Sequence, residues 1–231
     1  RPSFMTKTHI QTLVTTGLAF AAIPATSSAV SIGLIDFEAG PTGFFAFAEN
    51  GGSIATIHPT TGAGASVGVA ARVNSDPGSY AGGGLSQFDL SLAGIDGGSV
   101  TVEDFDTIAG SFDVNIPVGQ SISFRLEPAN GSYGERVELG NTISGTGAFE
   151  TIIFNAASAS NGAQKTTLVN HLNGDSATGL KFIFQINNQS GSVGSDFVFD
   201  NIELTAGPIP EPSSFALGLA GMMMLLGRRK R

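Results

Sequence analysis

The stretch from Leu180 to Ile186 reads LKFIFQI and alternates a strictly apolar position with a more variable one. Side chains of a β-strand point alternately to its two faces, so Leu180, Phe182, Phe184 and Ile186 share one face. The stretch from Ser121 to Leu126, SISFRL, shows the same period of two. This alternation predicts strands that bury one face in a core.

Similar alternation recurs along the rest of the chain. Turns rich in glycine separate the alternating stretches, and the chain has 32 glycines. Short apolar runs separated by turn residues are typical of all-β domains. Helical periodicity is indicated only at Gln164–Leu172. The sequence predicts an all-β fold, a two-sheet antiparallel jelly-roll sandwich, with strands near 31–37, 43–48, 66–73, 85–92, 99–105, 111–114, 121–126, 136–139, 149–155, 180–187 and 197–204.

Composition narrows the function classes. The chain has 17 Phe, no Trp and no Cys, which excludes disulfides and thiol chemistry and makes Phe the main core residue. Between Val30 and Ile209 there are eighteen Asp and Glu against five Lys and Arg, a net charge of −13. An acidic surface disfavours nucleic acid and anionic lipid as partners, and it favours cations such as calcium.

The N-terminal residues predict a secretory signal peptide at 5–29. Lys7 precedes a mostly apolar segment, and the small residues Ser27 and Ala29 occupy the minus-three and minus-one positions of a cleavage site after Ala29. A first membrane-spanning helix is the alternative, which the short apolar core disfavours. One sandwich domain is expected at 30–206, followed by a separate tail at 207–231.

The tail combines three features. Pro210, Glu211 and Pro212 lie in an extended, proline-rich linker; Phe215–Leu226 is a run without charge; and Arg228–Arg231 is basic. A helix over the uncharged run would cover about 18 Å of a hydrocarbon core of about 30 Å. The basic end would stay on the cytoplasmic side, with the sandwich outside.

This arrangement resembles the PEP-CTERM sorting signal of Gram-negative bacteria, in which a membrane enzyme, exosortase, handles the tail. The resemblance implies an exported protein, at the cell surface or extracellular, with transient or permanent anchoring in the inner membrane and an association with exopolysaccharide. An ordinary single-span tail anchor is the alternative. Both interpretations place the sandwich outside the cytoplasm.

A second resemblance covers the ends of the domain. Asp36-Phe37-Glu38 near the start and the stretch from Phe197 to Leu204, FVFDNIEL, are similar to the first and last strands of jelly-roll carbohydrate-binding modules and galactose-binding-like domains. In that family an early acid and a late Asp share a structural calcium. The resemblance implies calcium ligation by Glu38 and Asp200, with Asp36 as a second candidate. Solvated strand residues are the alternative.

Three function classes stay open. The leading one is a non-enzymatic surface or matrix protein without catalytic residues. The second is a carbohydrate-binding module, for which Tyr80 and Tyr133 are the candidate stacking residues, since sugars pack on amphipathic rings. The third is a secreted hydrolase, which needs two carboxylates about 5 to 9.5 Å apart; Glu135 with Glu138 or Glu150 are the pairs considered.

Overall fold

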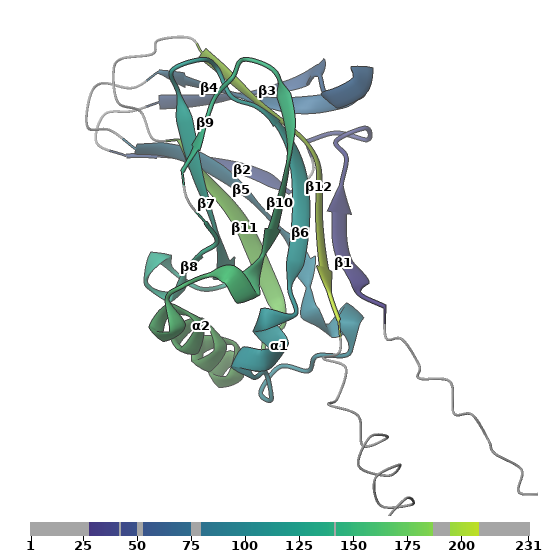
Figure 1. The fold of residues 1–231 in the computed structure, drawn as a ribbon, viewed down its shortest axis with the longest axis vertical. Coiled ribbons are helices and arrows are strands. Elements are labelled where there is room, and N and C mark those ends of the chain that lie inside the picture. Colours follow the sequence, from purple (N-terminus) through teal and green to yellow (C-terminus); the bar gives the residue numbers. More distant parts are fainter. Residues whose placement is uncertain are drawn as a thin grey trace, which may run out of the picture.

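The computed structural model describes residues 28–207 except 42, 50–52, 75–79, 141 and 187–194. Its strands form two antiparallel six-stranded sheets that face each other (Figure 1). The order in sheet A is β10-β6-β12-β4-β3, with β1 also paired to β12. The order in sheet B is β2-β5-β11-β7-β8, with β9 also paired to β7. The predicted all-β sandwich is confirmed.

The strand bounds follow the chain in order. They are β1 Val30–Ile35, β2 Phe44–Glu49, β3 Ser53–Thr61, β4 Val67–Asn74, β5 Tyr80–Asp89, β6 Ala109–Asn115, β7 Ser121–Pro128, β8 Val137–Glu138, β9 Ile143–Ser144, β10 Phe149–Asn155, β11 Gly179–Ile186 and β12 Ser195–Ala206. Short 3-10 helices interrupt them at η1 Ala63–Ala65, η2 Leu90–Ala93, η3 Tyr133–Glu135 and η4 Ala156–Ser158.

The alternating stretches occupy the centre of sheet B. β11 lies between β5 and β7, and Phe182 faces Leu126 while Phe184 faces Phe124 across the β11–β7 ladder. These apolar side chains are buried against sheet A. Phe182 lies 5.2 Å from Phe112 and 5.7 Å from Phe154 between ring centroids, so aromatic rings from both sheets fill the core.

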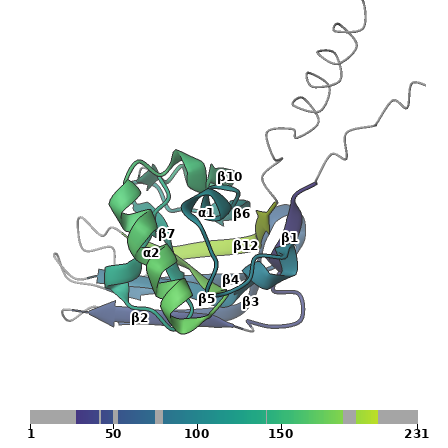
Figure 2. The ribbon, with the colours of Figure 1, turned by 90° about the horizontal axis from the view of Figure 1, so that it is seen from below.

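Two α-helices cover one end of the sandwich, α1 Val102–Asp106 and α2 Gly162–Asp175 (Figures 1 and 2). The expected strand at 99–105 is wrong, because a capping box starts a helix there. The Thr101 side chain accepts from the Asp104 amide, and the Asp104 carboxylate accepts from the Thr101 amide. The helix indicated at Gln164–Leu172 is confirmed and is longer, beginning after Asn161 as N-cap.

The first and last strands lie side by side. β1 pairs with β12 from Val30 opposite Ala206 to Ile35 opposite Ile202, so the described chain enters and leaves at the same end (Figure 1). In the part of the chain that the structure describes, no helix has the length and apolar character needed to cross a bilayer. Residues 5–27 of the predicted signal peptide, and the tail with Pro210, Glu211 and Pro212, lie outside the described residues. Ala29, after which cleavage is predicted, is described and directly precedes β1, and the cleavage stays a prediction.

Candidate functional site

A groove lies on the outer face of sheet B, the face turned away from sheet A. Its cavity volume is about 590 Å³. Strands β2, β7 and β11 supply most of its lining, and η3 closes one side. The lining residues, called the groove residues below, are Phe45, Phe47, Arg125, Glu127, Tyr133, Lys181, Ile183 and Gln185.

The register of sheet B explains why these side chains meet. Phe45 pairs with Gly84, Gly84 with Ile183, and Ile183 with Arg125, so this row of residues crosses four strands and places Phe45, Ile183 and Arg125 on the same face. Directly opposite residues of neighbouring strands point to the same side of a sheet. The same alternation that buries Phe182 and Phe184 therefore turns Ile183 outward into the groove.

Glycines in β5 set the floor of the apolar half. A Cβ atom on Gly84 would lie 2.8 Å from Cζ of Phe45, and one on Gly82 would lie 2.5 Å from Cζ of Phe47. Side chains are excluded at both positions, because a Cβ would also overlap the Phe184 carbonyl oxygen at Gly82 and lie 2.7 Å from the Phe182 carbonyl oxygen at Gly84. The rings are half-buried, so part of their apolar surface stays accessible from the groove.

A network of charges forms the other half of the floor. Arg125 Nε donates to Glu127 Oε1 at 2.7 Å, and Lys181 Nζ lies 3.5 Å from Glu127 Oε2. Arg125 Nη1 also donates to Gln185 Oε1 at 3.2 Å. Arg125 and Glu127 are only 5% and 4% exposed. The Glu127 carboxylate is thus held by a cation at each oxygen, and this network is fixed before any ligand arrives.

Tyr133 stands at the rim on η3. Its ring centroid lies 3.5 Å from Cζ of Arg136 and 5.0 Å from Cζ of Arg125, both cation–π distances, and 54% of the residue is exposed. Arg136 Nε donates to Glu138 Oε1 at 2.8 Å, and its Nη1 donates to the Tyr133 carbonyl oxygen at 2.9 Å. The rim residue is therefore positioned by two arginines.

A capping box fixes the turn that carries Tyr133. The Ser132 amide donates to Glu135 Oε2 at 2.7 Å, and the Gly134 amide donates to the Ser132 hydroxyl. Hydrogen bonds from the Ser132 hydroxyl and amide lower the pKa of the Glu135 carboxyl. His171 of α2 lies 3.9 Å from Glu135 and 3.2 Å from Asp175, which links this turn to α2.

The two tyrosines proposed for glycan contact have different outcomes. Tyr133 is one of the groove residues, as described above. Tyr80 begins β5, but its side chain lies outside the described residues. The apolar platform of the groove comes instead from Phe45 and Phe47, which sequence reasoning assigned to the core.

The three candidate calcium ligands lie near the β1 end of sheet A. Asp36 and Glu38 are exposed in the turn after β1, where the Glu38 amide donates to Asp36 Oδ1 at 3.2 Å. Asp200 is fully buried and accepts from the Ala63 amide at 2.9 Å, the Asn201 amide at 2.8 Å and the Ser66 hydroxyl.

Asp200 thus joins β12 to the 62–66 turn. A Cβ on Gly62 would overlap its carboxylate. Within the described ranges, no three carboxylates or imidazoles are grouped to hold a metal ion. The donors around Asp200 are amides and a hydroxyl, a set suited to a carboxylate without a metal, and calcium binding stays a prediction.

The carboxylates considered for hydrolysis are held separately. Glu135 belongs to the capping box, Glu138 pairs with Arg136, and Glu150 on β10 of sheet A accepts from the Thr146 hydroxyl at 2.9 Å. Glu135, which is common to both pairs considered, lies on η3, whereas Glu138 lies on β8 of sheet B and Glu150 on β10 of sheet A. Each of these acids has a local structural partner.

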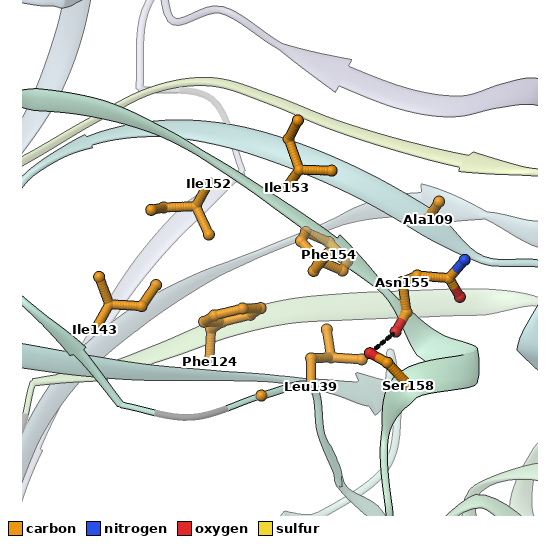
Figure 3. A pocket seen from close by; sticks show the side chains of 10 residues that line it. Ala109, Phe124, Leu139, Ile143, Ile152, Ile153, Phe154, Asn155 and Ser158 are labelled. Carbon is orange, nitrogen blue, oxygen red and sulfur yellow. Dashed lines mark hydrogen bonds between the residues drawn. The ribbon is translucent and has the colours of Figure 1, made fainter.

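A second cavity, of about 470 Å³, opens where β10 of sheet A faces β7–β9 of sheet B. Figure 3 shows its lining, which is mainly apolar: Phe124 and Ile143 come from sheet B, Leu139 directly follows β8, and Ile152 and Phe154 come from β10. Asn155 contributes a carbonyl oxygen that accepts from the Ser158 hydroxyl at 2.6 Å (Figure 3). Polar groups converge on the groove and not on this cavity, so the groove is the better candidate site.

The two facing antiparallel sheets define a β-sandwich of the class found in carbohydrate-binding modules. One similar structure is the family 11 carbohydrate-binding module of the cellulosomal cellulase Lic26A-Cel5E of Clostridium thermocellum. It is 15% identical, and the match covers 78% of this chain and 96% of the module with a TM-score of 0.51.

The solution structure of CtCBM11 is 18% identical, over 81% of this chain and 99% of that one, with a TM-score of 0.52. At these identities the likeness shows the fold alone. No protein-family model matches the chain, and no curated protein matches its sequence.

Proposed function

We propose that this protein is an exported glycan-binding protein that contacts polysaccharide through the groove on sheet B. The observation that carries the proposal is the convergence of two accessible Phe rings with a fixed polar network in one cavity. Flat apolar rings pack on the apolar face of a sugar ring, and charged groups hydrogen-bond its hydroxyls. The sandwich likeness to carbohydrate-binding modules supports the same proposal.

In this proposal the protein is not an enzyme. The groove carboxylate, Glu127, bonds Arg125 on one side and Lys181 on the other, which suits orientation of a ligand better than proton transfer. The carboxylates considered for hydrolysis are engaged elsewhere, as described above. Retention of a soluble glycan without release of reducing sugar is the expected behaviour.

The test compares the native protein with Phe45→Ala and Phe47→Ala in affinity gel electrophoresis over soluble β-glucans, xylan and polyuronates. We expect retention by at least one polymer and about a 10-fold or larger loss of affinity in each variant, equal to about 1.4 kcal/mol. The matched control is Leu34→Ala, since Leu34 is a large apolar residue, 60% exposed, on β1 of sheet A. Equal retention of the Phe variants and the native protein would refute the site.

We further propose that the tail sorts the protein to the cell surface, where exopolysaccharide is the partner and an exosortase-type enzyme does the processing. The support is the sequence Pro210-Glu211-Pro212 followed by the uncharged run and the basic end. In its own host we expect intact mass to show loss of residues 5–29 and of the tail. Changing Pro210, Glu211 and Pro212 to alanine should keep the tail and leave the protein in the membrane fraction. Identical processing of both forms would favour a plain anchor.

A further inference from the structure

The positive charges of the domain are concentrated at the groove. Between Val30 and Ile209 the chain has only five Lys and Arg, and three of them, Arg125, Arg136 and Lys181, lie in the groove or on its rim. The groove residues include two cations and one anion, a net charge of +1. The rest of the 30–209 region then carries −14. The floor of the groove is thus a local positive site in a strongly acidic protein, whereas on its rim Arg136 is paired with Glu138.

Arg125 is a buried cation with unused donors. A guanidinium has five N–H groups. Nε donates to Glu127 and Nη1 donates to Gln185. Among the residues that the structure describes, Nη2 has no acceptor, although Arg125 is only 5% exposed. Within the described residues, Nη2 is not one of the fully buried atoms that lack a partner, so its N–H groups are accessible from the groove and available to an acceptor from a ligand.

The carboxylate and amide acceptors of the groove already face its cations. Both oxygens of Glu127 face cations, and Oε1 of Gln185 accepts from Arg125. A neutral sugar hydroxyl forms the most hydrogen bonds where it can both donate and accept. The polar side chains of this groove offer mainly donors. A carboxylate only accepts, and its two oxygens fit the planar fork of a guanidinium. The donor excess therefore favours an anionic ligand group.

We propose that the groove selects acidic glycans of the uronic-acid class, with the sugar carboxylate bound by Arg125 and attracted by Lys181 while a neighbouring ring packs on Phe45 and Phe47. This inference rests on the glycan-binding function proposed above. The acidic remainder of the domain repels a long polyanion everywhere except at the groove, so binding is confined to short segments of the chain.

The first experiment uses a matched pair of ligands, oligogalacturonate and the same oligosaccharide with all carboxyls methyl-esterified, measured by isothermal titration calorimetry. We expect the free acid to bind about 10-fold tighter or more, since a charge-assisted pair contributes about 1.5 to 3 kcal/mol. Raising salt from about 0.1 M to 1 M shortens the screening length from about 10 Å to 3 Å and should narrow this difference.

The variants assign the effect to the groove. Lys181→Gln should reduce the preference for the free acid several-fold. The charge-matched control Arg72→Gln, on β4 of sheet A, should not change it. The double variant Arg125→Met with Glu127→Met removes both members of the buried pair, and Lys181 keeps its hydrogen bond to the Gly131 carbonyl oxygen at 2.9 Å. A loss of the preference in a folded protein then identifies Arg125 as the carboxylate donor.

The outcomes separate the two proposals. Equal affinity for the free acid and the ester, or a preference that survives both groove variants, overturns the selection of acidic glycans and leaves glycan binding in place. If the protein binds a neutral β-glucan tightly and does not bind the uronate, the selection of acidic glycans is likewise overturned and glycan binding remains in place. Absence of binding to every glycan tested overturns both proposals.

Discussion

Replacing Glu127 by alanine should lower the free energy of unfolding by about 3 to 5 kcal/mol, the cost of breaking a buried ion pair from one side. Glu127 is 4% exposed and holds Arg125 at 2.7 Å and Lys181 at 3.5 Å. Without it Arg125, which is only 5% exposed, and Lys181 lose the carboxylate that they share. Urea unfolding followed by far-UV circular dichroism measures the loss, because the chain has no Trp to report by fluorescence.

The control for this experiment is the double variant Arg125→Met with Glu127→Met. Replacement of a complete buried pair by apolar residues of similar size is often neutral or stabilising. We expect the double variant to unfold within about 1 kcal/mol of the native protein. If Glu127→Ala alone were equally mild, solvent in the groove would be screening the network, and its rigidity could not support ligand selection.

The second large effect is expected at Asp200. Alanine at this position leaves the Ala63 and Asn201 amides without their side-chain acceptor, whereas the Ser66 hydroxyl keeps the Ala63 carbonyl oxygen as an acceptor at 2.6 Å. Hydrogen bonds to a charged group contribute about 1.5 to 3 kcal/mol each and are not additive, so we expect a loss of about 3 to 5 kcal/mol in urea unfolding. Ser66→Ala, which removes one donor and leaves the carboxylate in place, should cost about 1 kcal/mol.

The native protein and the Asp200→Ala variant together test whether the domain binds calcium. If Asp200 and Glu38 hold the predicted ion, a chelator lowers the melting temperature of the native protein, and added calcium restores it. The Asp200→Ala variant then responds to neither. A native melting temperature that ignores chelator and calcium assigns Asp200 to the β12–turn linkage alone.

Several strands were predictable because their local pattern agrees with the tertiary structure. The stretch 121–126 falls within β7 and 180–187 nearly coincides with β11, since one apolar face per strand matches one buried face per sheet. β3 was missed because Pro59 and a run of Thr interrupt its pattern, and its ladder shifts register between Ile57 and Thr60. At 99–105 the apolar residues indicated a strand. The Thr101–Asp104 capping box instead stabilises the first turn of a helix there.

The site was only partly predictable. Tyr133 could be named from residue type, but Phe45 and Phe47 could not, because Phe is usually a core residue. The sequence FFAF at 44–47 did hold a signal, since alternation must place Phe on both faces of that strand. Which face is open depends on the pairing of β2 with the glycines of β5 about 35 residues away, and a local pattern contains no information on that pairing.

The position of β12 determines how the domain carries mechanical load. This twelve-residue strand lies inside sheet A, bonded to β6 on one side and to β4 and then β1 on the other. A pull at Gly207 along the strand loads these ladders in shear, so many hydrogen bonds must break together and not one after another. Because β1 is hydrogen-bonded to the same end of β12, it also resists the peeling of β12 from the sheet there. A domain tethered through its C-terminal strand could therefore sustain tension between a surface and a polymer held on sheet B.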